Sequence, residues 1–256
     1  MKRWISCLVL TLLTGLMAHA QTPTTSPSNN ASLDPILDAL HARGVGLKDF
    51  TADVSLAESD TLGTGNSTLT GKVWYQAKGE GDARMRVLFD KKQIGKRIDP
   101  SAKVEYLLDK GWLVDRDYKN KVQVDRQVLK PGQKINLLKL GEGPFPLPIG
   151  QPREEVLKMF EVKQIDPSQE DPANTVHIQL TPKPDSQFAR KFQTIDVWVD
   201  TQNHFPVRIE TLDPNGTEVR TTNLSNIQVN QGIGDRQFTL EKIGNDWKMR
   251  SEELEQ

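Results

Sequence analysis

Most of this chain alternates apolar and polar residues with a period of two, in short segments separated by turn-forming residues. The alternation begins at Phe50, Ala52, Val54 and Leu56. It recurs over residues 69–75, 85–89, 104–108, 112–116, 121–128, 176–180, 195–199, 207–209 and 218–229. Such segments are typical of half-buried strands. Connections such as Asp109-Lys110-Gly111 are too short for crossovers, so we predict a mostly antiparallel β domain over residues 33–247.

The N-terminus has the parts of a cleavable secretion signal. Lys2 and Arg3 precede an apolar run that ends near Ala18-His19-Ala20, and that run is shorter than the roughly twenty residues of a membrane span. We therefore expect a signal peptide over residues 1–20 and a periplasmic location. Cys7 would leave with the signal, so no thiol or disulfide chemistry is expected afterwards. Residues 21–32 are rich in Pro, Ser, Thr and Asn and are predicted to be a disordered linker.

Two helices and an apolar loop interrupt the strands. Asp34 as N-cap and Pro35 at the first helical position predict a helix that ends near Gly44. Its apolar side would carry Leu33, Ile36, Leu37 and Leu40. A loop rich in proline and glycine follows at 141–152, and a second helix is predicted from Pro152 through Phe160. Phe238 and Leu240 are expected to close the sheet, and residues 248–256 to form a polar, frayed tail.

The charge balance and the motif content both favour binding over catalysis. Without Lys2 and Arg3, 31 basic residues stand against 34 acidic ones, which gives no electrostatic case for nucleic acid or for an anionic membrane surface. The chain has no G-x-S-x-G elbow, phosphate-binding glycine loop or dinucleotide fingerprint. The histidines after the signal have no metal-ligand spacing. We expect no enzyme activity, catalytic residue, metal or cofactor.

A sheet that curves into an incomplete barrel needs its concave face filled by side chains, by helices or by a ligand. The apolar alternation supplies candidate residues for the lining of such a cavity. These are Val54, Leu56, Val73, Tyr75, Met85, Val87, Phe89, Leu107, Trp112, Val114, Leu138, Phe145 and Leu147. Taken singly, each of them is more readily explained as packed core, and the cavity prediction applies to the set as a whole. Ile36, Leu37 and Leu40 would lie in a helical lid over the cavity.

Arg84 and Arg86 share one face of the strand whose other face carries Met85 and Val87. On an outer face they would simply be solvated. Placed at the cavity rim instead, one of them would bond lid backbone carbonyls and gate the cavity.

The sequence resembles the periplasmic outer-membrane lipoprotein carriers, the LolA-like family. The resemblance lies in two N-terminal motifs, Leu47-Lys48-Asp49-Phe50-Thr51-Ala52 and Gly71-Lys72-Val73-Trp74-Tyr75. It also lies in three C-terminal motifs that follow one another in the order typical of the family: Trp198-Val199-Asp200, Pro206-Val207-Arg208-Ile209 and Leu224-Ser225-Asn226-Ile227. It covers most of the chain after the signal. The GPFPLPIG loop is closer to the lipoprotein-sorting branch of the family, whereas the long N-terminal linker is not a hallmark of it.

This resemblance implies an unclosed antiparallel β-barrel, or half-barrel, lidded by short α-helices. Its apolar concavity would shelter the acyl chains of lipoproteins on their way from the inner to the outer membrane. Partners would be an inner-membrane releasing complex and an outer-membrane acceptor, met by a soluble monomer. An alternative is a sensor that binds a lipidated ligand in the same half-barrel and signals without transport. A hydrolase is disfavoured, because the nucleophile and base are missing.

Overall fold

A computed structural model describes residues 30–62, 65–79, 82–130, 132–134, 137–138 and 149–254 of the chain. The predicted signal peptide and most of the predicted linker lie outside these ranges. Within them, no helix combines the length and the apolar character that crossing a membrane would require.

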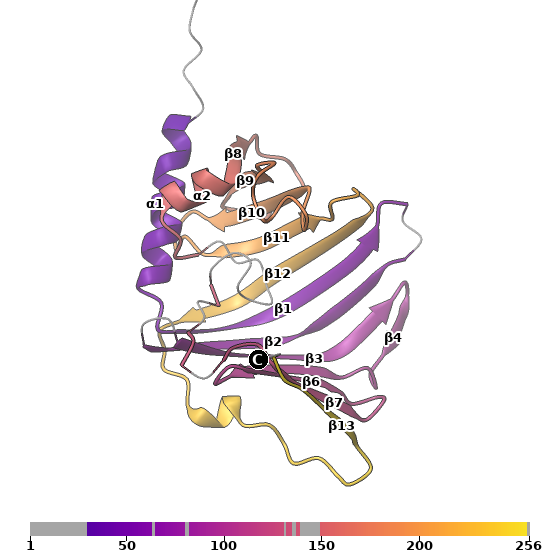
Figure 1. The fold of residues 1–256 in the computed structure, drawn as a ribbon. Coiled ribbons are helices and arrows are strands. Elements are labelled where there is room, and N and C mark those ends of the chain that lie inside the picture. Colours follow the sequence, from indigo (N-terminus) through magenta and orange to yellow (C-terminus); the bar gives the residue numbers. More distant parts are fainter. Residues whose placement is uncertain are drawn as a thin grey trace, which may run out of the picture.

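The described residues form one large sheet of thirteen strands (Figure 1). The strands are β1 (Asp49–Asp60), β2 (Ser67–Gly79), β3 (Asp82–Ile94), β4 (Arg97–Asp99), β5 (Val104–Asp109), β6 (Trp112–Asp117), β7 (Val122–Gln127), β8 (Phe160–Ile165), β9 (Thr175–Pro182), β10 (Thr194–Asp200), β11 (Pro206–Leu212), β12 (Glu218–Val229) and β13 (Lys248–Glu252). Their order is β13-β7-β6-β5-β3-β2-β1-β12-β11-β10-β9-β8, and β4 pairs with β3 alone.

The sheet is unclosed and mostly antiparallel, as predicted. Its two end strands, β13 and β8, are not paired with each other, and the β13–β7 pairing is the parallel one among the described pairs. In Figure 1 the strands from β9 to β12 are seen face-on and those from β2 to β7 nearly edge-on, so the sheet is strongly curved. The long pairing of β1 with β12 joins the first half of the chain to the second.

Hairpin loops set the register of the early strands. Lys110 and Gly111 have positive φ angles of 52° and 80° and form a two-residue loop that pairs Asp109 with Trp112. Loops of this kind match the twist of the strands they join, and glycine takes the left-handed conformation without strain. Leu108 consequently lies opposite Leu113.

Helix α1 (Asn30–Val45) begins five residues before Pro35, the first helical position that the sequence predicted. Pro35 lies inside the helix and not in its first turn. Its nitrogen has no hydrogen to donate to the preceding turn, yet the helix continues through it to Val45. Leu33, Leu37 and Leu40 are buried as expected, with Ile36 partly buried against the core.

The second helix, α2 (Arg153–Met159), starts directly after Pro152, as predicted. It ends one residue earlier than expected, because Phe160 is extended and opens β8. Phe160 is nonetheless buried and packs against Phe188, with ring centroids 5.0 Å apart. The apolar residue at the helix end therefore serves the sheet.

Helix α1 is held against the segment that leads into α2. The Gly150 N–H donates to the Leu40 carbonyl over 3.1 Å, and Arg153 forms ion pairs with Asp34 and Asp38. A β-carbon at Gly44 would lie 2.3 Å from the Gly150 backbone, so this close approach requires glycine. Both helices consequently lie together at the β8 end of the sheet (Figure 1).

Asn230 ties the start of β1 to the end of β12. Its side-chain oxygen accepts from the N–H groups of Lys48 and Asp49, and its amide nitrogen donates to the Gly46 carbonyl. The buried Asp49 carboxylate accepts in turn from the N–H of Gly232. These bonds fix the point where α1 enters the sheet.

The C-terminal segment departs from the prediction. Phe238 lies in a 3₁₀ helix, η1 (Asp235–Phe238), and neither it nor Leu240 belongs to a strand. The tail expected to fray forms β13, which pairs in parallel with β7 from Lys248↔Val122 onwards. Ion pairing between Arg126 and Glu252 supports this pairing. Polar edge strands show no apolar alternation, so the sequence pattern gave no sign of β13.

Candidate functional site: a pocket on the inner face of the sheet

The face of the sheet that turns toward α1, here called the inner face, carries the main apolar core. Phe50, Tyr75 and Met85 lie on it, and the Phe50 and Tyr75 rings stack with centroids 5.5 Å apart. Directly paired residues share a face in an antiparallel sheet. The pairs Phe50↔Tyr75, Tyr75↔Met85 and Met85↔Leu108 therefore extend the inner face from β1 to β5.

Part of the inner face remains open as a pocket of 670 Å³. It lies over β1, β2, β3, β5 and β6, near the β3–β4 hairpin. Its lining residues are Leu56, Glu58, Leu69, Phe89, Lys92, Ile94, Asp99, Ala102, Val104, Tyr106, Leu113, Asp117, Lys119, Asn120 and Arg220. The volume falls within the range of about 300–1,000 Å³ that small-molecule sites occupy.

The polar residues of the pocket are largely engaged with one another. Asp99 accepts from Lys119 over 2.7 Å and from the Ser101 hydroxyl over 2.6 Å. The Lys119 bond, followed by those from Ser101, holds the pKa of Asp99 well below its usual range. Arg220 pairs with Glu58 over 3.4 Å. The apolar residues are therefore what the pocket offers to a ligand, with charged groups among them.

Two of the predicted lining residues, Leu56 and Phe89, line this pocket. Five others share the inner face but pack within the core: Val54, Val73, Tyr75, Met85 and Val87. Leu138 is also buried in the core, and Phe145 and Leu147 lie outside the described residues. The structure thus brings the candidates of β1, β2 and β3 together on one face, as the alternation predicted.

Leu107, Trp112 and Val114 lie on the opposite, outer face of the sheet. Leu107 is paired with Arg86 and with Val114, while its neighbour Leu108 is paired with Met85. A shift of one residue moves a whole strand to the other face. Since residues 107 and 108 are both leucine, the local pattern could not decide which of them faces inward, and the predicted choice was wrong.

The residues that replace them on the inner face are Tyr106, Leu108 and Leu113. Tyr106 and Leu113 line the pocket together with Leu69, Ala102 and Val104. The signal that identifies them is the pairing of β5 with β3, which becomes visible only in the folded chain. Trp112 contributes instead to a separate depression of 380 Å³ beside Gly111 and Leu129.

Arg84 and Arg86 lie on the outer face, opposite Met85 and Val87. They are not solvated, because the C-terminal segment covers them. Arg84 is 6% exposed, forms an ion pair with Asp235 and lies 4.0 Å above the Phe238 ring. The two arginines therefore contact the C-terminal segment, on the face away from α1, and the rim-gating position considered for them is not the one observed.

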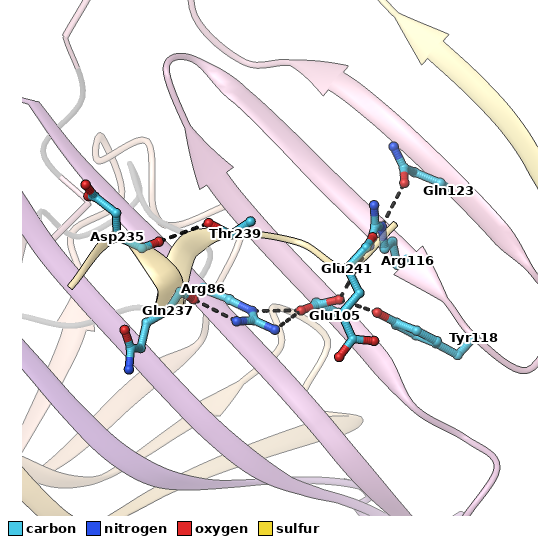
Figure 2. Close-up of polar contacts among 9 residues, drawn as sticks. All are labelled: Arg86, Glu105, Arg116, Tyr118, Gln123, Asp235, Gln237, Thr239 and Glu241. Atoms are coloured by element: carbon cyan, nitrogen blue, oxygen red, sulfur yellow. Dashed lines mark hydrogen bonds and ion pairs between the residues drawn. The ribbon is translucent and has the colours of Figure 1, made fainter. Parts of the chain in front are cut away.

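A buried ionic network surrounds Glu105 on this outer face (Figure 2). Glu105 is 1% exposed and accepts from Arg86 over 2.7 Å and from the Tyr118 hydroxyl over 2.5 Å. Arg86 also donates to the Gln237 carbonyl, and Arg116 to the Glu241 carbonyl. The network fastens the C-terminal segment to β3, β5 and β6 behind the pocket.

Among the described residues, no group of three His, Cys, Asp or Glu side chains is arranged to hold a metal ion. His177 bonds to Asp196 over 2.8 Å and stacks on Trp198, with ring centroids 4.1 Å apart. His41 bonds to the Gly150 carbonyl over 3.0 Å. Both histidines thus have structural partners.

No protein-family model matches the sequence, and no curated protein sequence matches it either. Several solved structures are similar at low identity. An uncharacterized conserved protein from Thermus thermophilus is 11% identical with a TM-score of 0.48, covering 86% of this chain and 99% of that one.

A chain of the Pseudomonas aeruginosa MucA/MucB complex is 12% identical with a TM-score of 0.46, covering 82% of this chain and 61% of its own. A LolA superfamily protein from Nitrosomonas europaea is 14% identical with a TM-score of 0.32, covering 80% of this chain and 96% of its own. The case for function therefore rests on the pocket and its residues.

Proposed function

We propose that this chain is a periplasmic carrier, not an enzyme, that binds the acyl chains of lipoproteins or of similar lipidated molecules. The acyl chains would lie in the inner-face pocket, and the carrier would move its cargo from the inner to the outer membrane. The observation that carries this proposal is a 670 Å³ pocket lined by Leu56, Leu69, Phe89, Val104 and Leu113. Partners would be an inner-membrane releasing complex and an outer-membrane acceptor, as the sequence resemblance implies.

The physical need for such a carrier follows from the cost of exposing acyl chains to water. Each buried methylene contributes about 0.8 kcal/mol, so a lipoprotein with long chains does not cross an aqueous space unaided. A carrier must release its cargo as well as bind it, so its cavity should hold acyl chains with only moderate affinity. The mixture of apolar residues with charged ones such as Lys92 and Asp117 in this pocket suits moderate affinity.

The proposal is tested by identifying what the protein holds when it is isolated. The full chain is expressed with its own N-terminus in a bacterium with two membranes, recovered by osmotic shock and examined by native mass spectrometry. We expect a bound acylated molecule, and we expect a fluorescent diacylated lipopeptide to compete for the same site. Recovery without any acylated species, together with no lipopeptide binding, would refute acyl binding.

Transport is tested separately from binding. Loaded protein is mixed with acceptor vesicles, and the acylated molecule is followed from the protein to the vesicle fraction. Transfer supports the carrier proposal. Tight retention, with no transfer to vesicles or to outer-membrane fractions, would instead support a sensor that uses the same pocket.

A further inference from the structure

The hairpin formed by β3 and β4 projects at the border of the pocket and exposes apolar side chains. Ile94 is 55% exposed and Ile98 is 61% exposed, one on each strand next to the turn at Gly95. Among the described strands, β4 pairs with β3 alone and has no partner on its other side. Packing against the described residues does not account for aliphatic side chains this exposed at a hairpin tip.

The two isoleucines point to opposite faces of the hairpin. Ile94 is paired with Arg97, and Ile98 with Gln93, so successive pairs place them on alternate faces. A partner protein with a flat or grooved surface would cover one face of the hairpin only. A medium that surrounds the tip accommodates both side chains at once, and the interfacial region of a lipid bilayer is such a medium.

The same hairpin is locally basic, although the whole chain carries a net charge of −1. Residues 90–99 contain Lys91, Lys92, Lys96 and Arg97 against two aspartates, and one of these, Asp99, already pairs with Lys119. In the part of the chain that the structure describes, no carboxylate forms an ion pair with any of the four basic side chains. Each such cation near an anionic leaflet contributes about 1 kcal/mol of attraction.

We propose that the β3–β4 hairpin docks this protein on the surface of a bilayer containing anionic phospholipids, with Ile94 and Ile98 entering the interface. Lys92, Ile94 and Asp99 also line the pocket, so docking brings the pocket mouth to the lipid surface. This goes beyond the proposed function, because it names a membrane surface as a partner and needs no acyl cargo. Because the net charge of the whole chain is only −1, its composition does not reveal this local basic patch.

The test is flotation of the full chain with vesicles of phosphatidylcholine alone and with added phosphatidylglycerol. We expect binding that requires phosphatidylglycerol and weakens with salt, since salt screens these charges. The double variants Ile94→Ser/Ile98→Ser and Lys91→Gln/Lys96→Gln should each lower the partition coefficient about tenfold or more. All four side chains are exposed, so both variants should fold.

Matched controls change equally exposed groups elsewhere. The variant Val45→Ser/Met249→Ser removes exposed apolar side chains. The variant Lys158→Gln/Lys163→Gln removes exposed charges of α2 and β8. Both control variants should bind vesicles like the wild type. The proposal is overturned by absent wild-type binding, by binding that ignores phosphatidylglycerol, or by hairpin variants that bind like the controls. Lipopeptide binding in solution, measured in parallel without vesicles, reports on the pocket separately.

Discussion

Leu108 lies directly opposite Met85 in the pairing of β5 with β3, and this places Leu107 opposite Arg86 on the other face of the sheet. The pairing determines which residues of the β5–β6 hairpin reach the pocket. Leu113 faces the pocket, whereas its neighbour Val114 faces outward.

A charge at residue 113 should therefore block acyl binding, and the same charge at residue 114 should not. We expect Leu113→Glu to weaken binding of a diacylated lipopeptide about tenfold or more, because the carboxylate would have to be desolvated beside the acyl chain. Val114→Glu is the matched control, since both side chains are half-buried in the same strand. Fluorescence titration measures both. Equal affinity of the two variants would remove this pocket as the acyl site.

The Glu105 network predicts a large loss of stability when its carboxylate is removed. Glu105→Ala would leave Arg86 and Arg116, with side chains 13% and 7% exposed, without their shared anion. Breaking a buried ion pair from one side costs about 3–5 kcal/mol in the free energy of unfolding. Glu58→Ala, which removes a carboxylate 42% exposed in its pair with Arg220, should cost less than about 1 kcal/mol. Urea unfolding measures both, and similar losses would contradict the assigned role.

The close contact between α1 and the segment before α2 predicts that Gly44 tolerates no side chain. Gly44→Ala would place a β-carbon 2.3 Å from the Gly150 backbone, and we expect a loss of about 1–3 kcal/mol in the free energy of unfolding. Gly46→Ala is the control, because its β-carbon would meet nothing nearer than 3.6 Å. Thermal unfolding compares the two variants. Equal stability would show that α1 is not held at this contact.

The raised pKa values of the three tyrosines predict how the stability of the fold decreases at alkaline pH. Burial raises the pKa of Tyr75 to about 12. Burial, with the hydrogen bond to Glu105, raises the pKa of Tyr118 to about 12, and burial also raises the pKa of Tyr106. In the unfolded chain these phenols have a pKa of about 10.

Because the folded protein holds these protons more tightly, their contribution to stability is complete below about pH 10 and is lost as the pH rises toward about 12. Ultraviolet absorbance of tyrosinate measures this. The protein has three tyrosines, and we expect little ionisation at pH 10 in buffer but half-ionisation near that pH in urea. A folded protein that titrates near pH 10 would contradict the burial of these side chains.

Local sequence was enough to predict the described strands other than β4, β8 and β13, together with the side-chain alternation within them. Phe50, Val54, Met85 and Phe89 face inward as their period of two requires, because successive side chains of a strand must point to opposite faces. Pro152 marked the start of α2 for an equally local reason, its fixed φ angle.

Which strands pair, in which register, and where the polar segments pack are decided only in the folded chain. Leu107 and Leu108 look alike in the sequence, and only the pairing with Met85 turns Leu108 inward. From the sequence, Arg84 and Arg86 could be solvated, whereas in the folded chain the C-terminal segment covers them. Strand β13 has no apolar pattern of its own and is held by its pairing with β7. Backbone pairing and ion pairs between distant residues depend on which segments meet in space, and no local periodicity encodes that.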